Sequence, residues 1–299
     1  RSIGRRGIAS LRSRMNIERI VSSSERGFVE RSVDYIESCM NTHHAQTKPT
    51  AGCFVLGVSG PNGRVRRERA LDTFTELAAR EGIEWERVRV FLVDERYGEL
   101  PTEEDSNAHL MRRAFSKRLP EAQLLVPDVS LPTVEECAAD YQARLGALLQ
   151  EHAPDGPHLT TLSLAPDGSV GSVFPEWYMH GETTRGAEGS RWALATQRRF
   201  GVLCTHTSSF ESPQRVAVSL RVVRKSGHIL VFTGNAPAAV QAPGGVRGGA
   251  SSAPPRSGEI ARDSAEIARD VDLVWRDISQ RVRQARSGAG AKAAAADPG

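Results

Sequence analysis

The sequence predicts an α/β fold built on a mainly parallel sheet, with helices covering both of its faces. Short apolar runs typical of buried strands alternate with amphipathic helical stretches through residues 26–163. Three β-rich runs then follow one another closely between residues 200 and 234. Because strands joined through helices usually pair in parallel, we expect the early strands to form the main sheet. The late strands are expected to extend this sheet or to form a small lobe.

Four stretches carry apolar residues at helical spacing. The first follows Ser24, whose hydroxyl suits an N-cap, and the last contains Thr133 and Glu136 in the spacing of a capping box. The predicted helices lie within residues 24–40, 67–81, 106–119 and 131–149. The side chains predicted to face the core are Phe28, Val33, Ile36, Met40, Leu71, Phe74, Leu77, Ala78, Val134, Cys137, Ala138, Tyr141 and Leu145.

Seven apolar runs have the length and composition of strands, and turn residues follow several of them. Residues 88–96 predict one buried strand that ends in Asp94, Glu95 and Arg96. The other predicted strands lie within residues 53–59, 123–127, 158–168, 200–206, 215–223 and 228–234.

The ends of the chain and one internal stretch differ in composition from the predicted domain, residues 26–283. Residues 1–25 form a basic leader, rich in arginine and serine and without an acidic residue before Glu18. This composition is typical of an organelle transit peptide, and the alternative is a basic leader with no targeting role. Residues 235–258 are a Gly/Ala/Pro-rich insertion expected to be flexible, and residues 284–299 are expected to form a disordered tail.

Composition excludes several classes of protein. The formal net charge of +3 is too small to indicate a nucleic-acid partner, and no apolar run reaches the roughly 18 residues of a membrane span. The 4 cysteines form no CxxC pair, so neither a zinc site nor a disulfide framework is expected. Three of them lie among apolar neighbours and are predicted to be small core residues: Cys53, Cys137 and Cys204.

Several chemically useful residues follow predicted strands. Ligands of open α/β sheets bind beyond the carboxyl ends of the strands. We therefore expect one site formed by residues 59–63, 94–96 and 166–169, with Arg215 nearby. The glycine-containing loop at residues 59–63 precedes a helix and could bind an anion. The alternatives are an ordinary turn there, a surface ion pair between Asp94 and Arg96, and an Arg215 side chain that extends to water.

The order of these motifs resembles the 6-phosphogluconolactonase family, sister to the glucosamine-6-phosphate deaminases, over roughly residues 26–282. Residues 91–110 are similar to its DER…DSN segment, and residues 164–175 to its GPDGH[TV]AS[LI]F motif. The further similar segments are SLPTVEECAADYQARL (130–145), SPQRVAVSL (212–220) and DLVWRDIS (272–279). The DER and DSN elements together favour the lactonase branch over the deaminases.

The resemblance implies hydrolysis of 6-phosphogluconolactone to 6-phosphogluconate in the pentose phosphate pathway, with neither metal nor organic cofactor. It also implies a general-base histidine after the Pro-Asp-Gly turn, but Ser169 occupies that position. The positions assigned to catalysis are Ser169, Asp167 and Asp94. Those assigned to substrate binding are Ser59, Gly60, Asn62, Gly63, Arg96 and Arg215.

Ser169 changes the expected chemistry. An imidazole titrates near neutral pH and can take a proton from water, whereas an isolated hydroxyl cannot. Ser169 could act as a nucleophile only with a base within hydrogen-bonding reach, for which the candidates are His158, His180 and His206.

The loop at residues 59–63 also departs from the family's Ser-Gly-Gly-Ser-Thr, because it has fewer hydroxyl donors and Pro61 has no N–H. Ser163 and Ala165 replace two family glycines, and the lysine usual before the PxR segment has no counterpart. We therefore expect a lactonase-like protein with weak or lost activity, retained as a structural or binding component.

The expected partners are a sugar phosphate and other subunits of an organellar assembly. The expected location is a mitochondrion or plastid, with the cytoplasm as the alternative. Two alternatives to the lost activity stay open: an active lactonase with a divergent base, and a repurposed sugar-phosphate sensor or isomerase-like enzyme.

Overall fold

The computed structural model describes residues 24–48, 52–60, 64–100, 102–163, 169–174, 201–207 and 212–232. The predicted insertion at residues 235–258, the tail and the leader up to residue 23 lie outside these residues.

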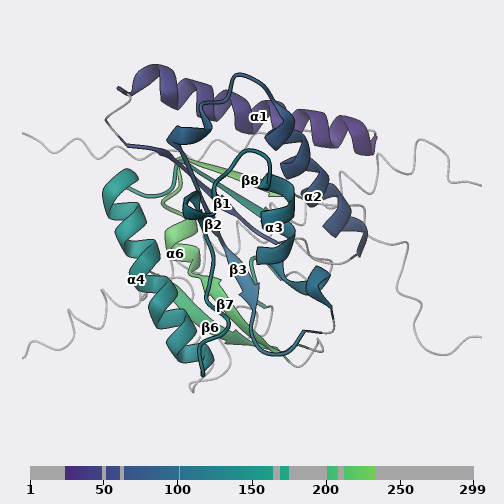
Figure 1. The fold of residues 1–299 in the computed structure, drawn as a ribbon, viewed down its shortest axis with the longest axis vertical. Coiled ribbons are helices and arrows are strands. Elements are labelled where there is room, and N and C mark those ends of the chain that lie inside the picture. Colours follow the sequence, from purple (N-terminus) through teal and green to yellow (C-terminus); the bar gives the residue numbers. More distant parts are fainter. Residues whose placement is uncertain are drawn as a thin grey trace, which may run out of the picture.

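Five strands form the parallel sheet predicted from the sequence (Figure 1). Its strand order is β4-β2-β1-β5-β8, so the late strand β8 extends the early sheet at the side of β5. The strands span Phe54–Val58 (β1), Val88–Leu92 (β2), Leu124–Leu125 (β4), Leu159–Ser163 (β5) and His228–Phe232 (β8).

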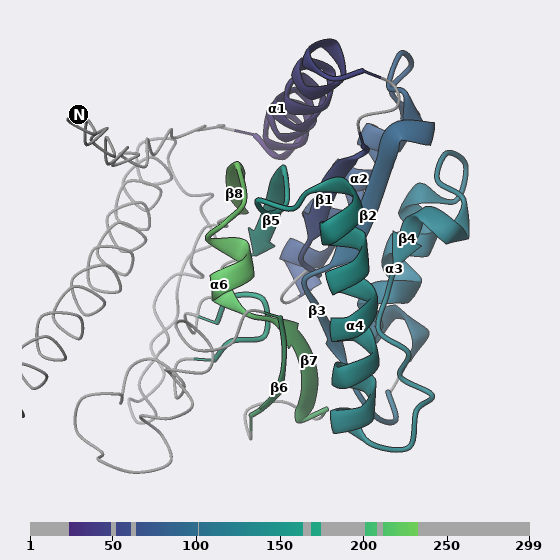
Figure 2. The ribbon, with the colours of Figure 1, turned by 90° about the vertical axis from the view of Figure 1, so that its left-hand side faces the viewer.

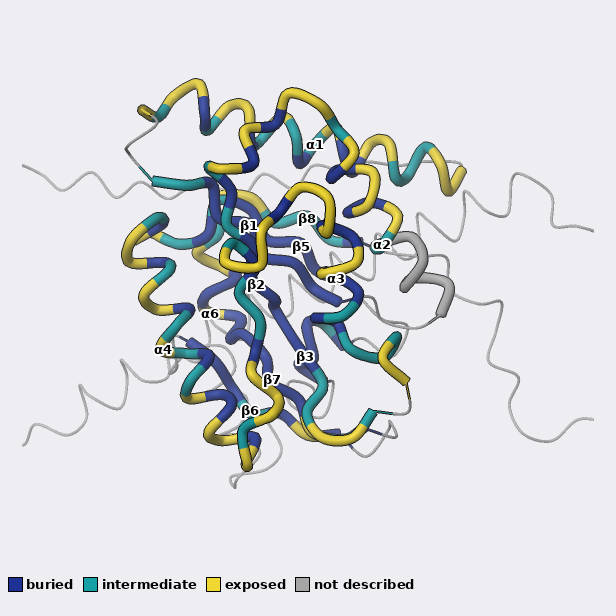
Figure 3. The backbone as a smooth tube through the Cα atoms, in the orientation of Figure 1, coloured by how far each residue is buried: buried dark blue, intermediate teal, exposed yellow. Residues whose placement is uncertain are grey.

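Helices cover both faces of this sheet. Side chains of a strand alternate between faces, and those of Phe54, Leu56 and Val58 enter the same core as three helices. Val55 faces the opposite way, into a second core that contains the inner side of α4. The helices are α1 (Glu25–Gln46), α2 (Arg64–Ala79) and α3 (Asn107–Phe115) on the first face, and α4 (Val134–His152) on the second. Figure 3 shows the buried strands between half-exposed helices.

The predicted helix caps are confirmed. The Ser24 hydroxyl accepts a hydrogen bond from the Gly27 amide at 3.1 Å, and Thr133 accepts one from Glu136 at 3.2 Å. Each hydroxyl pairs an amide that the first helical turn would otherwise leave without a partner. At the other end of α1, Arg87 donates to both the carbonyl and the hydroxyl of Thr47.

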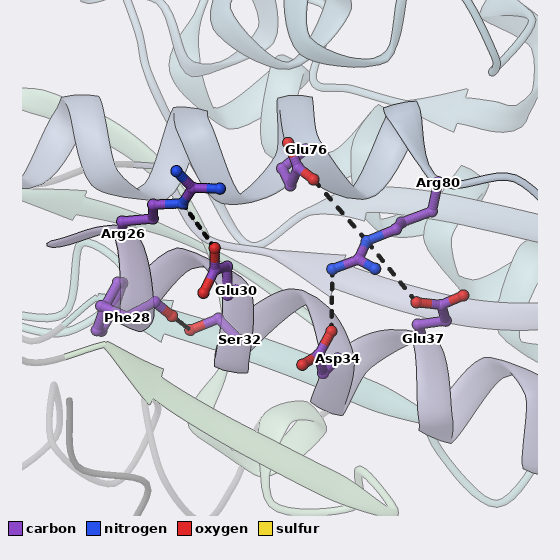
Figure 4. Close-up of polar contacts among 8 residues, drawn as sticks. All are labelled: Arg26, Phe28, Glu30, Ser32, Asp34, Glu37, Glu76 and Arg80. Atoms are coloured by element: carbon purple, nitrogen blue, oxygen red, sulfur yellow. Dashed lines mark hydrogen bonds and ion pairs between the residues drawn. The ribbon is translucent and has the colours of Figure 1, made fainter. Parts of the chain in front are cut away.

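Arg80 joins α1 to α2 on the protein surface (Figure 4). Its Nη2 lies 2.9 Å from Asp34 Oδ1, and its Nε lies 3.9 Å from carboxylates of both Glu37 and Glu76. Exposed ion pairs contribute little singly, so the apolar core beneath them, which includes Ile36 and Phe74, supplies most of the stability of this helix pair.

The predicted strand at residues 88–96 is divided between two sheets. The Val93 amide donates to Val58 O at 2.8 Å and continues the parallel ladder, whereas its carbonyl accepts from Val218 N at 2.7 Å. Asp94–Arg96 (β3) then pairs antiparallel with Gln214–Val218 (β7), which also pairs with Val202–His206 (β6). The expected small lobe is this second sheet.

The prediction of one strand over residues 215–223 is wrong, because β7 ends at Val218 and residues Leu220–Val223 form the short helix α6. The Ser219 carbonyl accepts from Val222 N at 2.9 Å, which starts that turn. Figure 2 shows β6 and β7 at the opposite end of the molecule from α1. Short 3₁₀ turns complete the fold at Trp85–Arg87 (η1), Glu103–Asp105 (η2) and Glu121–Gln123 (η3).

The helices of the described part of the chain are all too short or too polar to cross a membrane. All 4 cysteines are free, and Cys137 is fully buried against the second core, where burial raises the pKa of its thiol to about 11.

Alanine substitutions at two glycines, one in the sheet and one in α4, are expected to change the free energy of unfolding in opposite directions. A Cβ added to Gly57 in β1 would lie 2.6 Å from Phe91 and 2.9 Å from Thr160, whereas Gly146 in α4 faces open space. We expect Gly57→Ala to lower the free energy of unfolding by about 1–3 kcal/mol, through overpacking. Gly146→Ala should raise it by about 0.5–1 kcal/mol, because alanine favours the helix. Urea unfolding measures both, and equal effects of the two changes would contradict this packing.

Candidate active site

The candidate site lies where the two sheets meet, at the carboxyl end of β1. Asp94 and Arg96 are two residues apart on β3 and therefore point to the same face of the second sheet. Arg215 pairs with Arg96 across the strands, and Thr205 pairs with Arg215. Side chains of directly opposed residues share a face, so all four lie on one side of this sheet.

The segment 169–174 crosses this face. The Thr205 hydroxyl donates to the Ser172 carbonyl at 2.7 Å, and the Ser172 hydroxyl donates to Asp94 Oδ2, also at 2.7 Å. Val170 and Val173 pair through two backbone hydrogen bonds around a two-residue turn. Both turn residues have positive φ, 52° at Gly171 and 56° at Ser172, as in the tight turns of hairpins. This backbone conformation is unfavourable for serine, and it directs the Ser172 hydroxyl onto the carboxylate.

Asp94 joins three segments of the chain. Its carboxylate is 3 % exposed, and Oδ1 accepts from the Ser59 hydroxyl and the Gly60 amide, both at 3.2 Å. With the bond from Ser172, donors from the loop after β1 and from the segment 169–174 converge on one side chain of β3. The alternative of a surface ion pair with Arg96 is wrong, because Asp94 is buried and its partners are hydroxyls and an amide.

Glu95 points to the other side of β3 and positions α3. Its buried carboxylate accepts from the amides of Arg96, Asn107 and Ala108 at 2.7, 2.9 and 2.6 Å, and from the Ser106 hydroxyl at 3.0 Å. Burial raises the pKa of Glu95, although these four donors act in the opposite direction. A carboxylate at the N-terminus of a helix also interacts favourably with the helix dipole. The role of Glu95 is therefore structural.

Asn107 connects α3 to the site. Its Nδ2 donates to the Asp94 carbonyl at 2.8 Å, and its Oδ1 accepts from Arg96 Nη1 at 3.2 Å. Only a glycine fits at position 60, because a Cβ there would lie within 2.0 Å of the Asn107 amide group. The similarity between residues 94–96 and 105–107 and the family's DER and DSN elements thus corresponds to direct contacts between these segments.

Two arginines give the site its positive charge. Arg215 is only 5 % exposed, so the alternative that its side chain extends to water is wrong. Its Nη1 donates to the carbonyls of Ser212 and Gln214. Burial, followed by the charge of Arg96, lowers the pKa of Arg215 to about 10, so the Arg215 guanidinium stays charged at neutral pH.

Six of the nine residues assigned from the sequence lie in the described part of the chain: Ser59, Gly60, Asp94, Arg96, Ser169 and Arg215. Hydrogen bonds and strand pairing bring together all of these except Ser169. Ser169 is buried, at 2 % exposure, at the start of the segment whose Ser172 contacts Asp94. Asn62, Gly63 and Asp167 lie outside the described residues. Whether these nine positions act in catalysis or substrate binding stays a prediction.

The sequence reasoning gave no role to three residues that hold the site together: Ser172, Asn107 and Thr205. Asn107 belongs to a motif that was identified, so the motif itself was the signal. No sequence signal indicated Ser172 or Thr205, because their contacts depend on how the segment 169–174 lies on the second sheet.

The arrangement can bind an anion, but the described residues provide no clear proton acceptor. Its charged groups are two guanidiniums and a carboxylate that already accepts three hydrogen bonds. Among the described side chains no group of three or more His, Cys, Asp or Glu residues is placed to hold a metal ion.

The chain is similar to a known family and to proteins within it. A family model described as glucosamine-6-phosphate isomerases/6-phosphogluconolactonase matches residues 23–243. The probable 6-phosphogluconolactonase of Dictyostelium discoideum is 33 % identical over 95 residues, which are 31 % of this chain and 39 % of that protein. The 6-phosphogluconolactonase of Synechocystis sp. is 33 % identical over 104 residues, 33 % of this chain and 43 % of that protein. The match thus spans about two-fifths of each relative.

Solved structures give the same fold. The 6-phosphogluconolactonase from Plasmodium vivax superposes with a TM-score of 0.54 at 20 % identity, covering 70 % of this chain and 73 % of that one. The enzyme from Trypanosoma cruzi gives 0.53 at 19 % identity, covering 71 % and 78 %. At such identities the likeness concerns the fold alone.

Two substitutions at Asp94 test its joining role. Asp94→Ala would leave the Gly60 amide and the Ser172 hydroxyl without an acceptor, at about 1–3 kcal/mol for each that stays buried, while the Ser59 hydroxyl keeps the Gly60 carbonyl at 3.3 Å. We expect it to lower the free energy of unfolding by about 3 kcal/mol or more. Asp94→Asn keeps an oxygen for Ser59 and Gly60 and places an NH₂ group against the Ser172 hydroxyl, which can rotate to accept. We expect a loss below about 1.5 kcal/mol for Asp94→Asn. Equal losses in urea unfolding would contradict the hydrogen-bond pattern.

Proposed function

Because the chain belongs to the family of glucosamine-6-phosphate isomerases and 6-phosphogluconolactonases, we propose that it is a 6-phosphogluconolactonase-like protein with weak or lost lactone hydrolysis. The substrate class of this site is a sugar phosphate of the pentose phosphate pathway. This assignment of the substrate class rests on the family and on the paired arginines beside the buried carboxylate.

The observation that carries the proposed loss of activity is the serine at position 169. This position follows the Pro-Asp-Gly turn, where the resemblance implies the general base, and its side chain is buried. A positioned general base contributes about 10²–10⁴-fold to the rate of proton transfer reactions. A serine hydroxyl cannot supply this contribution at neutral pH without a base of its own.

The described histidines give little support to a replacement base. His158 precedes β5, at the opposite end of that strand from the site, and its Nδ1 accepts a hydrogen bond from Val55 N at 2.9 Å. His206 ends β6 and is exposed, opposite Gln214 rather than Arg215. His180, the third candidate, lies outside the described residues.

A second candidate function is an active lactonase with a divergent base. Asp94, Arg96 and Arg215 favour it, because they are brought together as a substrate site would require. The two candidates therefore share sugar-phosphate binding and differ only in the chemical step.

For a protein without the chemical step, we propose a retained role as a structural or binding component of an organellar assembly. The arginine- and serine-rich leader supports a mitochondrial or plastid location.

A lactone assay with two variants at one position separates these functions. We expect acid release from fresh 6-phosphogluconolactone to proceed at the spontaneous rate with the wild-type protein and equally with Ser169→Ala. Ser169→His should raise the rate, by up to about 10²–10⁴-fold if the rest of the site binds substrate.

Other outcomes of the same assay have distinct meanings. Wild-type turnover well above the spontaneous rate would remove the proposed loss of activity. If Ser169→Ala then abolished that turnover, Ser169 would be a nucleophile. If Ser169→Ala left it unchanged, the base would lie elsewhere.

A further inference from the structure

Four histidines gather at the end of the parallel sheet opposite the candidate site. His43 and His44 lie in the last turn of α1, His152 is the last residue of α4, and His158 directly precedes β5. In Figure 1 the C-terminal ends of α1 and α4 lie on the same side of the molecule. Gly52, two residues before β1, lies beside the end of α4, since a Cβ on Gly52 would be 3.3 Å from the His152 carbonyl oxygen.

Three rings of this histidine cluster (His43, His44, His152 and His158) pack around Phe54, namely those of His43, His44 and His158. The His158 ring stacks on Phe54 with centroids 5.2 Å apart and an interplanar angle of 24°. The edge of His43 meets His158 at 4.1 Å and Phe54 at 5.6 Å, and His44 lies 5.8 Å from His43. The imidazoles therefore occupy the position of apolar core side chains between α1 and the sheet.

The hydrogen bond to His158 fixes its protonation state. Val55 N donates to His158 Nδ1 at 2.9 Å, so this nitrogen carries no proton. The backbone of His158 also pairs with β1 and β8, through Val55 O and His228 N, both at 3.0 Å. An imidazolium has donors at both nitrogens and could not accept from Val55. Protonation at Nδ1 would therefore break a bond inside the ladder of the sheet.

The other three histidines are also suited to the neutral state. His43 Nε2, both nitrogens of His44 and His152 Nδ1 are buried without a hydrogen-bond partner in the described part of the chain. A neutral imidazole tolerates this position at a moderate cost, whereas a charged one needs partners for its donors. These side chains do not converge as a metal-binding group among the described residues.

The charged groups that face the cluster come from η1 and α4. Arg87 lies at the end of α1, where its Nη1 reaches the His44 carbonyl at 3.5 Å and pairs with Glu84 at 3.0 Å. Glu151 Oε1 lies 3.6 Å from His152 Nε2 and is mostly exposed. A proton added to the cluster would thus meet one fixed cation and only peripheral carboxylates.

We propose that the histidine cluster is an acid-sensitive latch, which holds the C-terminal end of α1 against β1 and β5 only while its imidazoles are neutral. Acidification opens this end of the molecule. In the open state the imidazoles reach water and bind protons, whereas in the packed state they stay neutral, so a fall in pH favours the open state. The latch lies away from Asp94 and needs no ligand.

The pH at which the cluster opens, and the sign of that pH dependence, follow from the difference in histidine pKa between the packed and the open state. Burial, then the neighbouring His43, His152 and His44, lowers the pKa of His158 to about 4, and burial also lowers the pKa of His43 and His44. A released histidine titrates near 6.5. The contribution of the neutral histidines to the stability of the packed state is therefore complete above about pH 6.5, and it is lost as the pH falls from 6.5 toward 4.

Hydrogen exchange at the Val55 amide measures this opening directly. With a pKa of about 4 when packed and about 6.5 when released, His158 alone should lower the protection factor of Val55 about 30-fold between pH 7.5 and 5.0. His158→Asn offers an uncharged acceptor to Val55 and should flatten this dependence. The matched control is His109→Asn, because His109 lies on α3 near Glu103 and Glu104, outside the cluster, and it should keep the wild-type fall.

NMR titration of the histidine rings provides a second measurement on the unaltered chain. We expect the His158 ring to stay neutral at pH 5.5 in the folded protein. A His158 ring that titrates near pH 6.5 in the native state would overturn the latch. A constant Val55 protection factor would overturn it as well, and so would an undiminished fall in a folded His158→Asn variant.

Discussion

The backbone of Val93 serves two sheets at once, and the geometry of the candidate site depends on this division. Its amide completes the parallel pairing with β1, and its carbonyl begins the antiparallel pairing with β7. Asp94 therefore emerges at the junction, where β1 ends and the segment 169–174 crosses. The conformation of one residue thus places a carboxylate within reach of three donors from two separate parts of the chain.

The hydrogen bonds around this junction mainly maintain structure. Glu95 caps α3 by accepting three bonds from its N-terminus, and Asn107 links that helix to both Asp94 and Arg96. A protein that no longer hydrolysed its lactone would still need these contacts to fold. The DER and DSN elements are therefore compatible with the proposed loss of chemistry, which rests on other positions: Ser169, the loop after β1, Ser163, Ala165 and the lysine without a counterpart.

The sequence alone was sufficient to predict those elements that a local residue pattern specifies. The parallel sheet, the helices on both faces, and the caps at Ser24 and Thr133 follow from periodicity and from hydroxyl residues at helix starts. The division at Val93 could not be predicted, because residues 88–93 are suited to a buried strand throughout and the charged residues 94–96 indicate only where that strand ends.

The site was predictable only in part, for a related reason. The carboxyl ends of the strands indicated Ser59 and Asp94, since parallel strands deliver their ends to one edge, and the start of a late strand indicated Arg215. The contact of Ser172 with Asp94 depends on a positive φ at a serine, which composition does not indicate. The histidine cluster was similarly hidden, because its members are far apart in the chain and meet only through the packing of α1 and α4.

The central claim is that this site binds a sugar phosphate without a group that deprotonates water near neutral pH. A profile of 6-phosphogluconolactone consumption from pH 5 to 8, recorded with and without the protein, tests it most directly. The account predicts that the two profiles superimpose at every pH. A protein-dependent rate that rises through a single ionisation between pH 6 and 7 would contradict it, because that profile requires a working base in the site.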